Sequence, residues 1–527
     1  MLENKLVERK DFRVLITYPN YSMMLTPSYA VGLFTAILKK QGYNVDLFDC
    51  TQYMASYEES GIPNSLTLPK KLSAGRIFDP VKLLGVPKID LLGDFGRRID
   101  NFKPHAVVFS TVVQDTWPQT RDLLKILFEH SPQTKSIVGG VYTTMAPAKV
   151  ITDPYVQCIG EGEGEDTIID FCEAVRNGIS PIRIEGTRAK DENGKVICNP
   201  PRKLVDINET PIPDFSLFDK IRFNRPLGAK DWRAIPIETF RGCPYTCTFC
   251  NSPAQALIAE GKGQGNFRRR KSMDTLRTEI ITLLEKNDGN FLYINDDAFM
   301  ARPKEEIEAF AKMYADIRVP FWFQTRFEDI TEKHLAMLKG VGAYRISFGL
   351  EHGNEKFRKE KLLRNISNER MIEKSEIVTR VGIPYSVNVI IGMPEETRDL
   401  VFDTIRLNRQ LGGFDFAAPN IFTPYDGTRL RDKALEKGWL DPTLQTNSFV
   451  GYSLLRMPPP YLQPEEMLGL QRTYNFYVAF PEDRWPEIRS AETFDTEGNA
   501  VFESIRKEFF KQKYGTTAAE RMLTYAG

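Results

Sequence analysis

The sequence predicts an α/β protein with two successive series of strand–helix units, followed by a mostly helical C-terminal segment. Three observations lead to this prediction. Short apolar runs alternate with amphipathic stretches from residue 13 to about 180, the alternation resumes at Ala234, and it stops beyond Gly438. A chain of 527 residues is also too long for one ordinary hydrophobic core. We therefore divide the chain into residues 1–180, 181–230, 231–440 and 441–527.

The first series consists of apolar strands separated by amphipathic helices, and Gly42 ends the first helix. Alternation of this kind predicts a parallel, doubly wound, Rossmann-like sheet, which binds ligands at the carboxyl ends of its strands. The predicted strands are Arg13–Tyr18, Asn44–Asp49, Ala106–Ser110, Ser136–Val138 and Tyr155–Ile159, and the predicted helices are Tyr29–Gln41, Trp117–His130 and residues 165–177.

Two of these strand ends carry residues that suit ligand binding. Ser110, Thr111 and Val112 close one strand, and Gly139 and Gly140 close the next. A hydroxyl and paired glycines let the backbone approach a ligand closely. Considered alone, both features are weak signals that ordinary loop chemistry explains better.

The second series begins after a segment rich in Pro, Gly, Asn and charge, in which we expect a β-hairpin around Arg183–Cys198 and a linker. Six strand–helix units are fewer than the eight of a closed barrel, so we predict a partial (β/α)6 barrel with a wide lateral opening. Polar residues at its strand carboxyl ends should line the active face. The predicted strands are Ala234–Phe240, Phe291–Ile294, Phe321–Thr325, Tyr344–Phe348, Tyr385–Ile391 and Asp415–Ile421, and the predicted helices include Ser272–Lys286 and Pro303–Arg318.

Composition excludes several classes of protein. Lys plus Arg equals Asp plus Glu, 70 each, so we expect no nucleic-acid partner and interpret the run Arg268–Lys271 as a local anion contact or a solvated turn. The amino terminus has no apolar signal core, and no apolar run approaches the roughly 18 residues of a membrane span. We expect a cytoplasmic protein. The isolated cysteines are interpreted as buried small hydrophobes; they are Cys50, Cys158, Cys172 and Cys198.

The most informative motif is a group of three cysteines directly after the first barrel strand. Cys243, Cys247 and Cys250 lie at spacings of four and three residues, so their thiolates can converge on an iron–sulfur cluster. Three ligands on a four-iron cluster leave one iron open for chemistry. A structural zinc site would need a fourth Cys or His ligand nearby, and a disulfide cannot pair all three thiols.

At these residues the chain resembles the radical S-adenosylmethionine (SAM) superfamily, whose signature is CxxxCxxC with an aromatic residue just before the third Cys, here Phe249. The resemblance implies that Cys243, Cys247 and Cys250 hold a 4Fe-4S cluster whose open iron chelates the amino and carboxylate groups of SAM. Electron transfer then cleaves SAM to a 5′-deoxyadenosyl radical.

Residues at the ends of the other barrel strands resemble the SAM-binding residues of that family. Asn295 and Asp296 take the place of a Gly-Gly-Glu segment that holds the amino group of SAM. Glu351 takes the place of an acid that accepts hydrogen bonds from the ribose hydroxyls. Arg364 could pair with the methionyl carboxylate or could be a solvated helix residue. The end of the third strand adds two candidates, Gln324 and Arg326.

Two further segments add to the resemblance. Asn388–Glu395 matches the family pattern Gly-x-Ile-x-Gly-x-x-Glu, except that Asn replaces the first Gly. The match implies that Ile390 packs on adenine and that Gly392 lets the chain turn. Pro424–Thr428 resembles the Pro-Tyr-Pro-Gly-Thr turn that follows the last strand in the family.

With the cysteine motif downstream, the first series resembles the cobalamin-binding domain that precedes some radical SAM barrels. The resemblance implies that the two strand ends cradle the nucleotide tail of cobalamin, and that Glu161-Gly162-Glu163-Gly164 is the acidic glycine turn common in this family. The loop Pro19–Thr26 lacks the histidine that ligates cobalt in many cobalamin domains. The implied cobalamin-binding residues are Ser110, Thr111, Val112, Gly139, Gly140, Glu161 and Gly162.

The resemblance therefore implies a class B radical SAM methyltransferase-like enzyme, which contains a 4Fe-4S cluster, SAM and cobalamin. The implied reaction is methyl transfer to an unactivated carbon of a small molecule, with a flavodoxin- or ferredoxin-like electron donor. Alternatives are a radical cyclisation, rearrangement or redox step without methylation, methylthiolation of transfer RNA, and a non-enzymatic cobalamin sensor. The aromatic residues of the predicted helix Pro464–Phe480 could line a substrate pocket, although such residues more often form core.

Overall fold

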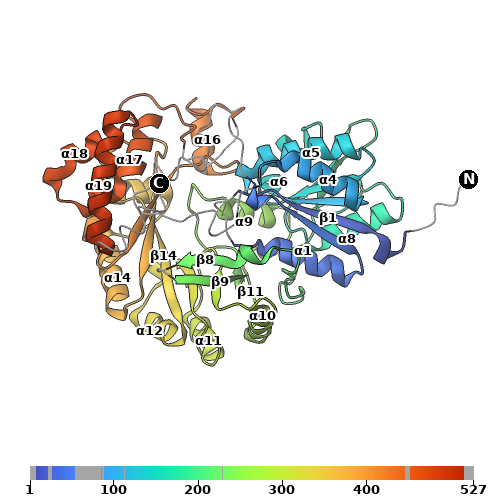
Figure 1. Cartoon of the computed structure of the whole chain (residues 1–527), viewed down its shortest axis with the longest axis horizontal. Helices are drawn as coiled ribbons and strands as arrows, with labels where there is room; N and C mark the ends of the chain where they lie inside the picture. The colour runs from blue at the N-terminus through green and yellow to red at the C-terminus, as the bar shows by residue number, and fades with distance from the viewer. Residues whose placement is uncertain are drawn as a thin grey trace, which may run out of the picture. The chain divides into compact units, whose positions relative to one another are not determined.

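The structure is a computed structural model that describes residues 7–21, 26–53, 85, 88–111, 113–227, 230–444 and 452–515. The chain, coloured from its N-terminus to its C-terminus in Figure 1, folds into two compact units. Unit 1 contains residues 1–54, 80–243 and 251–295, and unit 2 contains residues 55–79, 244–250 and 296–527.

Unit 1 contains a seven-stranded sheet with the strand order β2-β1-β3-β4-β5-β6-β7. Strands β1 to β5 pair in parallel, and β6 and β7 extend one edge as an antiparallel hairpin. The predicted parallel sheet and the predicted hairpin are both confirmed. The strands are β1 (Arg13–Tyr18), β2 (Asn44–Asp49), β3 (Ala106–Ser110), β4 (Lys135–Gly139), β5 (Cys158–Gly160), β6 (Thr187–Lys190) and β7 (Val196–Cys198).

Helices cover both faces of this sheet, as a doubly wound fold requires. Figure 1 shows α4 and α5 on one face and α1 and α8 on the other. Ser28 caps α1 by accepting a hydrogen bond from the Val31 amide, and Gly42, at a φ of 85°, follows its end. The helices are α1 (Tyr29–Lys40), α4 (Leu91–Phe102), α5 (Trp117–His130), α6 (Val141–Met145), α7 (Pro147–Ile151) and α8 (Glu165–Arg176).

The rest of unit 1 contains the beginning of the second strand–helix series. Strands β9 and β12 pair in parallel, β8 is antiparallel to β9, and β10 is antiparallel to β11. Ser272 caps α10 by accepting a hydrogen bond from the Thr275 amide. The elements are β8 (Asn224–Leu227), β9 (Lys230–Ile237), β10 (Phe240–Arg241), α9 (Asn251–Gly261), β11 (Arg269–Arg270), α10 (Met273–Lys286) and β12 (Phe291–Ile294).

Unit 2 continues the series with strands that again pair in parallel, from β13 through β16. Together with β9 and β12, all six predicted barrel strands are present among the described residues. In β15, buried residues alternate with half-buried ones, so its two faces have different surroundings. The elements are α11 (Lys304–Tyr314), β13 (Phe321–Thr325), α12 (Glu332–Val341), β14 (Ala343–Glu351), α13 (Glu355–Leu362), α14 (Asn368–Val381), β15 (Tyr385–Ile391), α15 (Arg398–Gln410), β16 (Phe416–Ile421) and α16 (Arg429–Glu436).

The C-terminal segment of unit 2 is helical, as predicted, and consists of α17 (Pro464–Ala479), α18 (Trp485–Ser490) and α19 (Thr496–Tyr514). Helix α17 packs against α15 and β16. Tyr474, Phe476 and Tyr477 are buried, which confirms that these aromatic residues form core. No helix in the described part of the chain combines the length and apolar character that a membrane span needs.

The structure confirms the α/β class and corrects several element boundaries. Strand β5 begins at Cys158 rather than Tyr155, because Asp153 accepts hydrogen bonds from the Tyr155 and Val156 amides and holds them in a turn. The predicted strand Ala234–Phe240 ends at Ile237, since Phe240 pairs with β11 instead. Cys50, Cys158 and Cys172 are buried as predicted, whereas Cys198 is exposed at the end of the hairpin.

Candidate functional site

The cysteine loop begins where β10 ends. Gly242 has a φ of 97°, and a Cβ there would lie 2.9 Å from the Phe267 carbonyl oxygen, so the turn into the loop requires glycine. Cys243 is the last residue of this part of unit 1, and Cys247 and Cys250 belong to unit 2. All three motif cysteines are half-exposed free thiols, unlike the buried cysteines elsewhere in the chain.

Within unit 2, the loop is anchored by its threonine and tyrosine. The Thr248 hydroxyl donates a hydrogen bond to the Lys361 carbonyl at 2.6 Å, and the Leu430 amide donates to the Thr248 carbonyl at 3.2 Å. The Tyr245 hydroxyl donates to the Asp329 carboxylate. These contacts fix the backbone on both sides of Cys247.

Two of the motif cysteines, Cys247 and Cys250, lie close together in unit 2. In the described ranges, no set of three His, Cys, Asp or Glu side chains is close enough to hold a metal ion. The Cys250 amide donates to the Cys247 carbonyl at 3.3 Å, so these two residues lie in one tight turn. Their role as cluster ligands, with Cys243 and the neighbouring Phe249, therefore stays a prediction.

Arg326, at the end of β13, lies directly beside Cys247. Its Nη1 is 3.7 Å from the Cys247 Sγ, and its guanidinium carbon is 3.6 Å from the centre of the Tyr245 ring. The other side of the guanidinium donates a hydrogen bond to Glu328. Burial raises the pKa of the Cys247 thiol, while the Arg364 and Arg326 guanidinium groups oppose this rise. Positive charge beside the sulfur favours the thiolate, which is the form that binds metal.

Glu351 closes β14 in an unusual backbone conformation. Its φ is 66°, and the pairing of β14 with β15 shifts by one residue between Gly349 and Glu351. Such irregularities re-aim side chains and are concentrated at functional sites. Arg364 Nη1 donates to Glu351 Oε1 at 3.2 Å, and its Nη2 donates to the Gly349 carbonyl at 2.5 Å. Burial raises the pKa of Glu351, and the Arg364 and Arg326 charges oppose it.

Arg326, Glu328, Glu351 and Arg364 form what we call the charged cradle. Three polar atoms of the cradle are buried and have no hydrogen-bond partner, namely Arg326 Nε, Arg364 Nε and Glu328 Oε2. Native proteins rarely leave buried polar groups unpaired. The cradle therefore fits a ligand with both an acceptor for the arginines and a donor for the glutamates, as a zwitterionic amino acid would supply. Sequence reasoning missed Glu328, because no family motif pointed to it.

Three further residues that were predicted to bind SAM differ in their exposure and hydrogen bonds. Asn295 is exposed at the end of β12 in unit 1. Asp296, in unit 2, is buried, and its carboxylate accepts a hydrogen bond from Arg302 Nη2 at 2.6 Å. Gln324 Nε2 donates to the Asp296 carbonyl at 3.2 Å. Asp296 and Gln324 are thus already engaged in hydrogen bonds within unit 2. Their ligand-binding role stays a prediction.

The turn after β15 is held by Glu396, the residue directly after the glutamate of the sequence pattern. Glu396, not Glu395, accepts hydrogen bonds from the amides of Gly392 and Met393. Glu396 is buried, and its Oε1 lies 3.2 Å from the buried His352 Nε2. Glu395 instead forms ion pairs with two lysines near the surface. The carboxylate must reach back to the first amides of the turn, and only the side chain of residue 396 does so.

Gly392 and Ile390 occupy positions that suit a flat ligand. Gly392 has a φ of 84°, and a Cβ there would lie 2.4 Å from the Met467 sulfur. Ile390 is half-buried and lies on the same face of β15 as Asn388 and Ser386. This face of the strand therefore leaves an apolar side chain partly accessible next to a tight turn.

In unit 1, the paired glycines after β4 leave open space at the carboxyl end of the sheet. A Cβ on Gly139 would meet no heavy atom within 4 Å, and Gly140 has a φ of 129°. The Thr111 amide donates to the Gly139 carbonyl at 2.8 Å, which ties the ends of β3 and β4 together. At the end of β1, Thr17 Oγ1 is buried without a hydrogen-bond partner. These features fit a bulky polar ligand laid across the strand ends.

Most of the other predicted cobalamin-binding residues are buried or already hydrogen-bonded within the protein. Ser110 and Thr111 are buried, and the Thr111 hydroxyl lies 3.1 Å from the Thr120 hydroxyl. Val112 lies outside the described residues. The Glu161 carboxylate accepts hydrogen bonds from Arg188 Nε at 2.5 Å and Lys262 Nζ at 2.6 Å, and the Gly162 amide donates to Thr144 at 2.9 Å. A direct contact of Glu161 or Gly162 with cobalamin stays a prediction.

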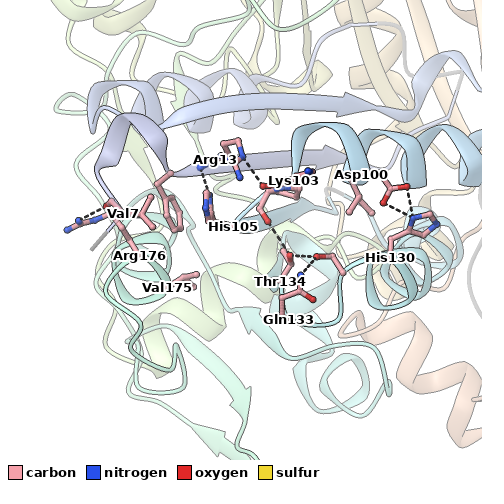
Figure 2. Close-up of a pocket in the computed structure, with 14 residues that line it drawn as sticks. Val7, Arg13, Asp100, Lys103, His105, His130, Gln133, Thr134, Val175 and Arg176 are labelled. Atoms are coloured by element: carbon pink, nitrogen blue, oxygen red, sulfur yellow. Dashed lines mark hydrogen bonds and ion pairs between the residues drawn. The ribbon is translucent and has the colours of Figure 1, made fainter. Parts of the chain in front are cut away.

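A separate cavity of about 660 Å³ lies in unit 1 at the opposite, amino-terminal ends of β1 and β3 (Figure 2). Its polar groups are already engaged with one another. Arg13 Nε donates to the Lys103 carbonyl at 2.8 Å, the Arg13 amide donates to His105 Nδ1 at 2.9 Å, and His130 pairs with Asp100. This cavity is therefore distinct from the glycine turns at the carboxyl ends.

Comparison with known families places a recognised domain on the second strand–helix series. Residues 237–407 match the model described as the Radical SAM superfamily. The match begins at the last residue of β9 and ends within α15, so it includes the cysteine motif, the charged cradle and the turn after β15.

Three characterised or named relatives resemble the chain in sequence. An uncharacterized methyltransferase of Pyrococcus horikoshii is 25% identical over 78% of this chain and 86% of its own length. Cytidylyl-2-hydroxyethylphosphonate methyltransferase of Streptomyces wedmorensis is 21% identical over 82% of this chain and 84% of its own. Anaerobic magnesium-protoporphyrin IX monomethyl ester cyclase of Rubrivivax gelatinosus is 24% identical over 62% of this chain and 58% of its own.

Two solved structures share the fold over nearly the whole chain. The cobalamin-dependent SAM radical enzyme OxsB, solved with aqua-cobalamin and SAM, has a TM-score of 0.63 at 14% identity and covers 98% of this chain and 78% of its own. The radical SAM methyltransferase TsrM from Kitasatospora setae, solved with cobalamin and a [4Fe-4S] cluster, has a TM-score of 0.58 at 15% identity and covers 94% of this chain and 99% of its own. The predicted combination of a Rossmann-like domain and a partial barrel is thus found in known proteins.

Proposed function

We propose that this chain, whose residues 237–407 form a radical SAM domain, is a cobalamin-dependent radical SAM enzyme that transfers a methyl group to an unactivated carbon of a small molecule. The observation that carries the proposal is the charged cradle beside Cys247, with its unpaired buried donors and acceptor. Methyltransferases among the relatives and cobalamin in the structural neighbours support it.

The motif cysteines and the cradle have separate tasks in this proposal. Cys243, Cys247 and Cys250 hold a 4Fe-4S cluster, which supplies the electron that cleaves SAM to a 5′-deoxyadenosyl radical. Arg326 and Arg364 hold the methionyl end of SAM through a carboxylate, because the guanidinium groups are buried, charged donors. The glutamates of the cradle accept from its amine and ribose hydroxyls.

The turn after β15 supports the adenine end. Ile390 offers an apolar contact for the ring, and the absence of a side chain at Gly392 permits the turn that Glu396 fixes. His352, which directly follows Glu351, contacts Glu396. One buried pair therefore connects the segment that binds ribose to the segment that binds adenine, so both are positioned together.

The open turn at Gly139 and Gly140 holds cobalamin in this proposal. The lack of a side chain at these positions lets the backbone approach the ligand, and the hydrogen bond from Thr111 to Gly139 keeps the turn in place. Cobalamin held at this turn would supply the methyl group. We also propose a cytoplasmic location and an electron donor similar to flavodoxin or ferredoxin.

One alternative is favoured by a specific observation: a relative is a cyclase of a porphyrin ester rather than a methyltransferase. A cyclisation would use the same cluster and cradle without methyl transfer. Methylthiolation of transfer RNA is disfavoured, because Cys50, Cys158 and Cys172 are buried on separate elements and do not form a second metal-binding group within the described ranges.

Product analysis tests the proposal. The anaerobically purified chain, reconstituted with iron, sulfide and cobalamin, should convert SAM to both 5′-deoxyadenosine and S-adenosylhomocysteine when a substrate is methylated. Formation of 5′-deoxyadenosine without S-adenosylhomocysteine would favour cyclisation and reject methylation. Failure to cleave SAM under reduction would reject the radical SAM assignment.

A further inference from the structure

The acidic glycine turn between β5 and α8 contains carboxylates that contact the start of the cysteine loop rather than open space. Glu163 Oε1 accepts a hydrogen bond from Arg241 Nη1 at 2.6 Å, and its Oε2 accepts from Arg269 Nη1 at 2.8 Å. Glu165, at the beginning of α8, also accepts from Arg241 Nη1, at 2.8 Å. All of these residues belong to unit 1. The turn is therefore an anchor for two arginines that are distant in sequence.

These two arginines pair across the two-stranded ribbon that leads into the motif. Arg241 in β10 lies opposite Arg269 in β11, and Cys243 follows Arg241 by two residues. Gly242, which lies between Arg241 and Cys243, has a φ of 97°, and a Cβ there would lie 2.9 Å from the Phe267 carbonyl oxygen, so a side chain is excluded at this point. Whatever fixes Arg241 thus also fixes the position from which the Cys243 side chain projects.

The contact between the acidic turn and the ribbon is ionic and mostly buried. The exposed fractions of the side chains are 12% for Glu163, 18% for Arg241 and 15% for Arg269. Glu163 bridges both guanidinium groups, and charge-assisted hydrogen bonds of this kind are strong and directional. Removing one partner of a buried pair leaves the other charges uncompensated, which costs more than losing an exposed pair.

The protonation states agree with this arrangement. Although burial raises the pKa of Glu163, the charges of Arg269 and Arg241 lower it below the usual value for a glutamate. Burial lowers the pKa of Arg241, but its three carboxylate neighbours, including Glu238, raise it overall. Glu163 is therefore ionised at neutral pH, and the ion pairs with the ribbon persist.

The same turn is bonded to the glycines after β4. The Thr143 hydroxyl donates to the Gly160 carbonyl at 2.6 Å and the Gly162 amide donates to the Thr144 hydroxyl at 2.9 Å, and both hydroxyls lie within hydrogen-bond distance of the Gly140 carbonyl. The acidic turn is thus held on one side by the helix that follows Gly140 and on the other by the ribbon.

We infer that Glu163 is a positioning residue for the iron–sulfur cluster, which it serves by fixing Arg241 and Arg269 and so the backbone that presents Cys243. The inference rests on the proposed role of Cys243 as a cluster ligand and concerns Glu163 alone, since Glu161 of the same turn pairs with Arg188 and Lys262. Groups that orient a metal ligand from outside the ligand set typically change metal affinity about 10- to 100-fold when they are removed.

The test compares Glu163→Gln with Glu173→Gln in the full-length chain. Glu173 is a matched control, because it is a partly exposed carboxylate on α8 that is paired with Arg176 and Arg9 and does not contact the ribbon. After anaerobic reconstitution, the rate of iron loss to a chelator, the cobalamin content and the melting temperature are measured. Glu163→Gln should lose iron about 10-fold faster than the control and keep the cobalamin content of the control, although the loss of a buried ion pair lowers its melting temperature somewhat.

Other results would overturn the inference in different ways. Equal rates of iron loss in the two variants would show that Glu163 does not position the ligand. Faster loss accompanied by an equal fall in cobalamin content would show a general structural role. If Glu163→Gln does not fold, Glu163→Asp is used; it keeps the charge but is too short to bridge both arginines, so an unchanged rate would also reject the inference. Wild-type protein that takes up no iron would instead reject the proposed function.

Discussion

At the scale of single residues, Glu351 has the features of a ligand-binding residue that is held in an unfavourable conformation. It combines a positive φ, a break in strand register and a buried carboxyl group whose pKa is raised by that burial. Arg364 on one side gives the carboxylate a partner without occupying both oxygens. The second oxygen remains available for a donor such as a hydroxyl.

The raised pKa of Glu351 gives SAM binding a defined pH dependence. Hydroxyl groups donate to the ionised carboxylate, so the affinity of the reconstituted protein for SAM should fall as the pH is lowered toward that pKa, starting above the ordinary glutamate value of about 4.3. Glu351→Gln should bind SAM roughly 10-fold or more weakly, since a hydrogen bond to a charged group contributes about 1.5–3 kcal/mol. Equilibrium binding measured from neutral pH downward in both proteins tests both effects.

The control for this experiment is Glu305→Gln, which changes an exposed glutamate in the first turn of α11. It should keep both the affinity and the pH dependence of the wild type. A Glu351→Gln variant that weakens with falling pH as steeply as the wild type would show that another group is responsible.

At the scale of elements, the turn after β15 shows how far a local motif can be derived from sequence. The pattern correctly located β15 and the glycine at its end, because a β-branched run followed by Gly-x-Pro is a strong local signal. It gave no role to Glu396, which has the same side chain as its neighbour Glu395 in the pattern. Only the three-dimensional turn shows which carboxylate reaches the Gly392 amide.

Gly392 should be more sensitive to substitution than a glycine that shares its backbone conformation in an open environment. Gly392 and Gly438 have φ values of 84° and 69°, but a Cβ at Gly392 would collide with the buried Met467, whereas one at Gly438 would meet nothing within 4 Å. Gly438→Ala should cost about 1 kcal/mol for the strained backbone, and Gly392→Ala should cost about 1–3 kcal/mol more for overpacking.

Thermal or denaturant unfolding of the two variants measures this difference. The comparison removes the contribution of backbone strain, because both positions are left-handed. Equal destabilisation would mean that Met467 moves aside at little cost and that the contact does not restrict the turn.

At the scale of the whole molecule, sequence reasoning identified both strand–helix series and most of their strands, because period and spacing are local properties. It did not find the charged cradle as a group. Its members come from the segment after β13, from β14 and from the segment after α13, and only the fold brings them together. The role of Glu163 was not found for the same reason, since its two arginine partners lie more than 70 residues away.

The two cofactor sites should be separable by mutation. Gly139→Val places a side chain in the open space at the end of β4, and Gly139 does not have a left-handed conformation, so the variant should fold, lose cobalamin and keep iron. Cys247→Ala should lose iron and keep cobalamin. Ultraviolet–visible absorption of the corrin and a chemical assay of iron measure both contents in each variant.

Loss of both cofactors from either variant would contradict the assignment of the two sites to different parts of the chain. Cys198→Ala serves as a control, because it removes an exposed thiol that lies outside the motif, and it should retain both cofactors.

The unequal exposure of the seven cysteines also has a consequence for handling the protein in air. Cys50, Cys158 and Cys172 are buried, and burial raises the pKa of each of these thiols, so they react slowly with oxidants. The motif thiols are half-exposed and close in sequence, so peroxide would convert them to sulfenic acids and then to mixed or internal disulfides. Aerobic damage would thus be concentrated at the residues on which activity depends, and a thiol reductant added before iron would restore them unless oxidation has reached the sulfinic acid.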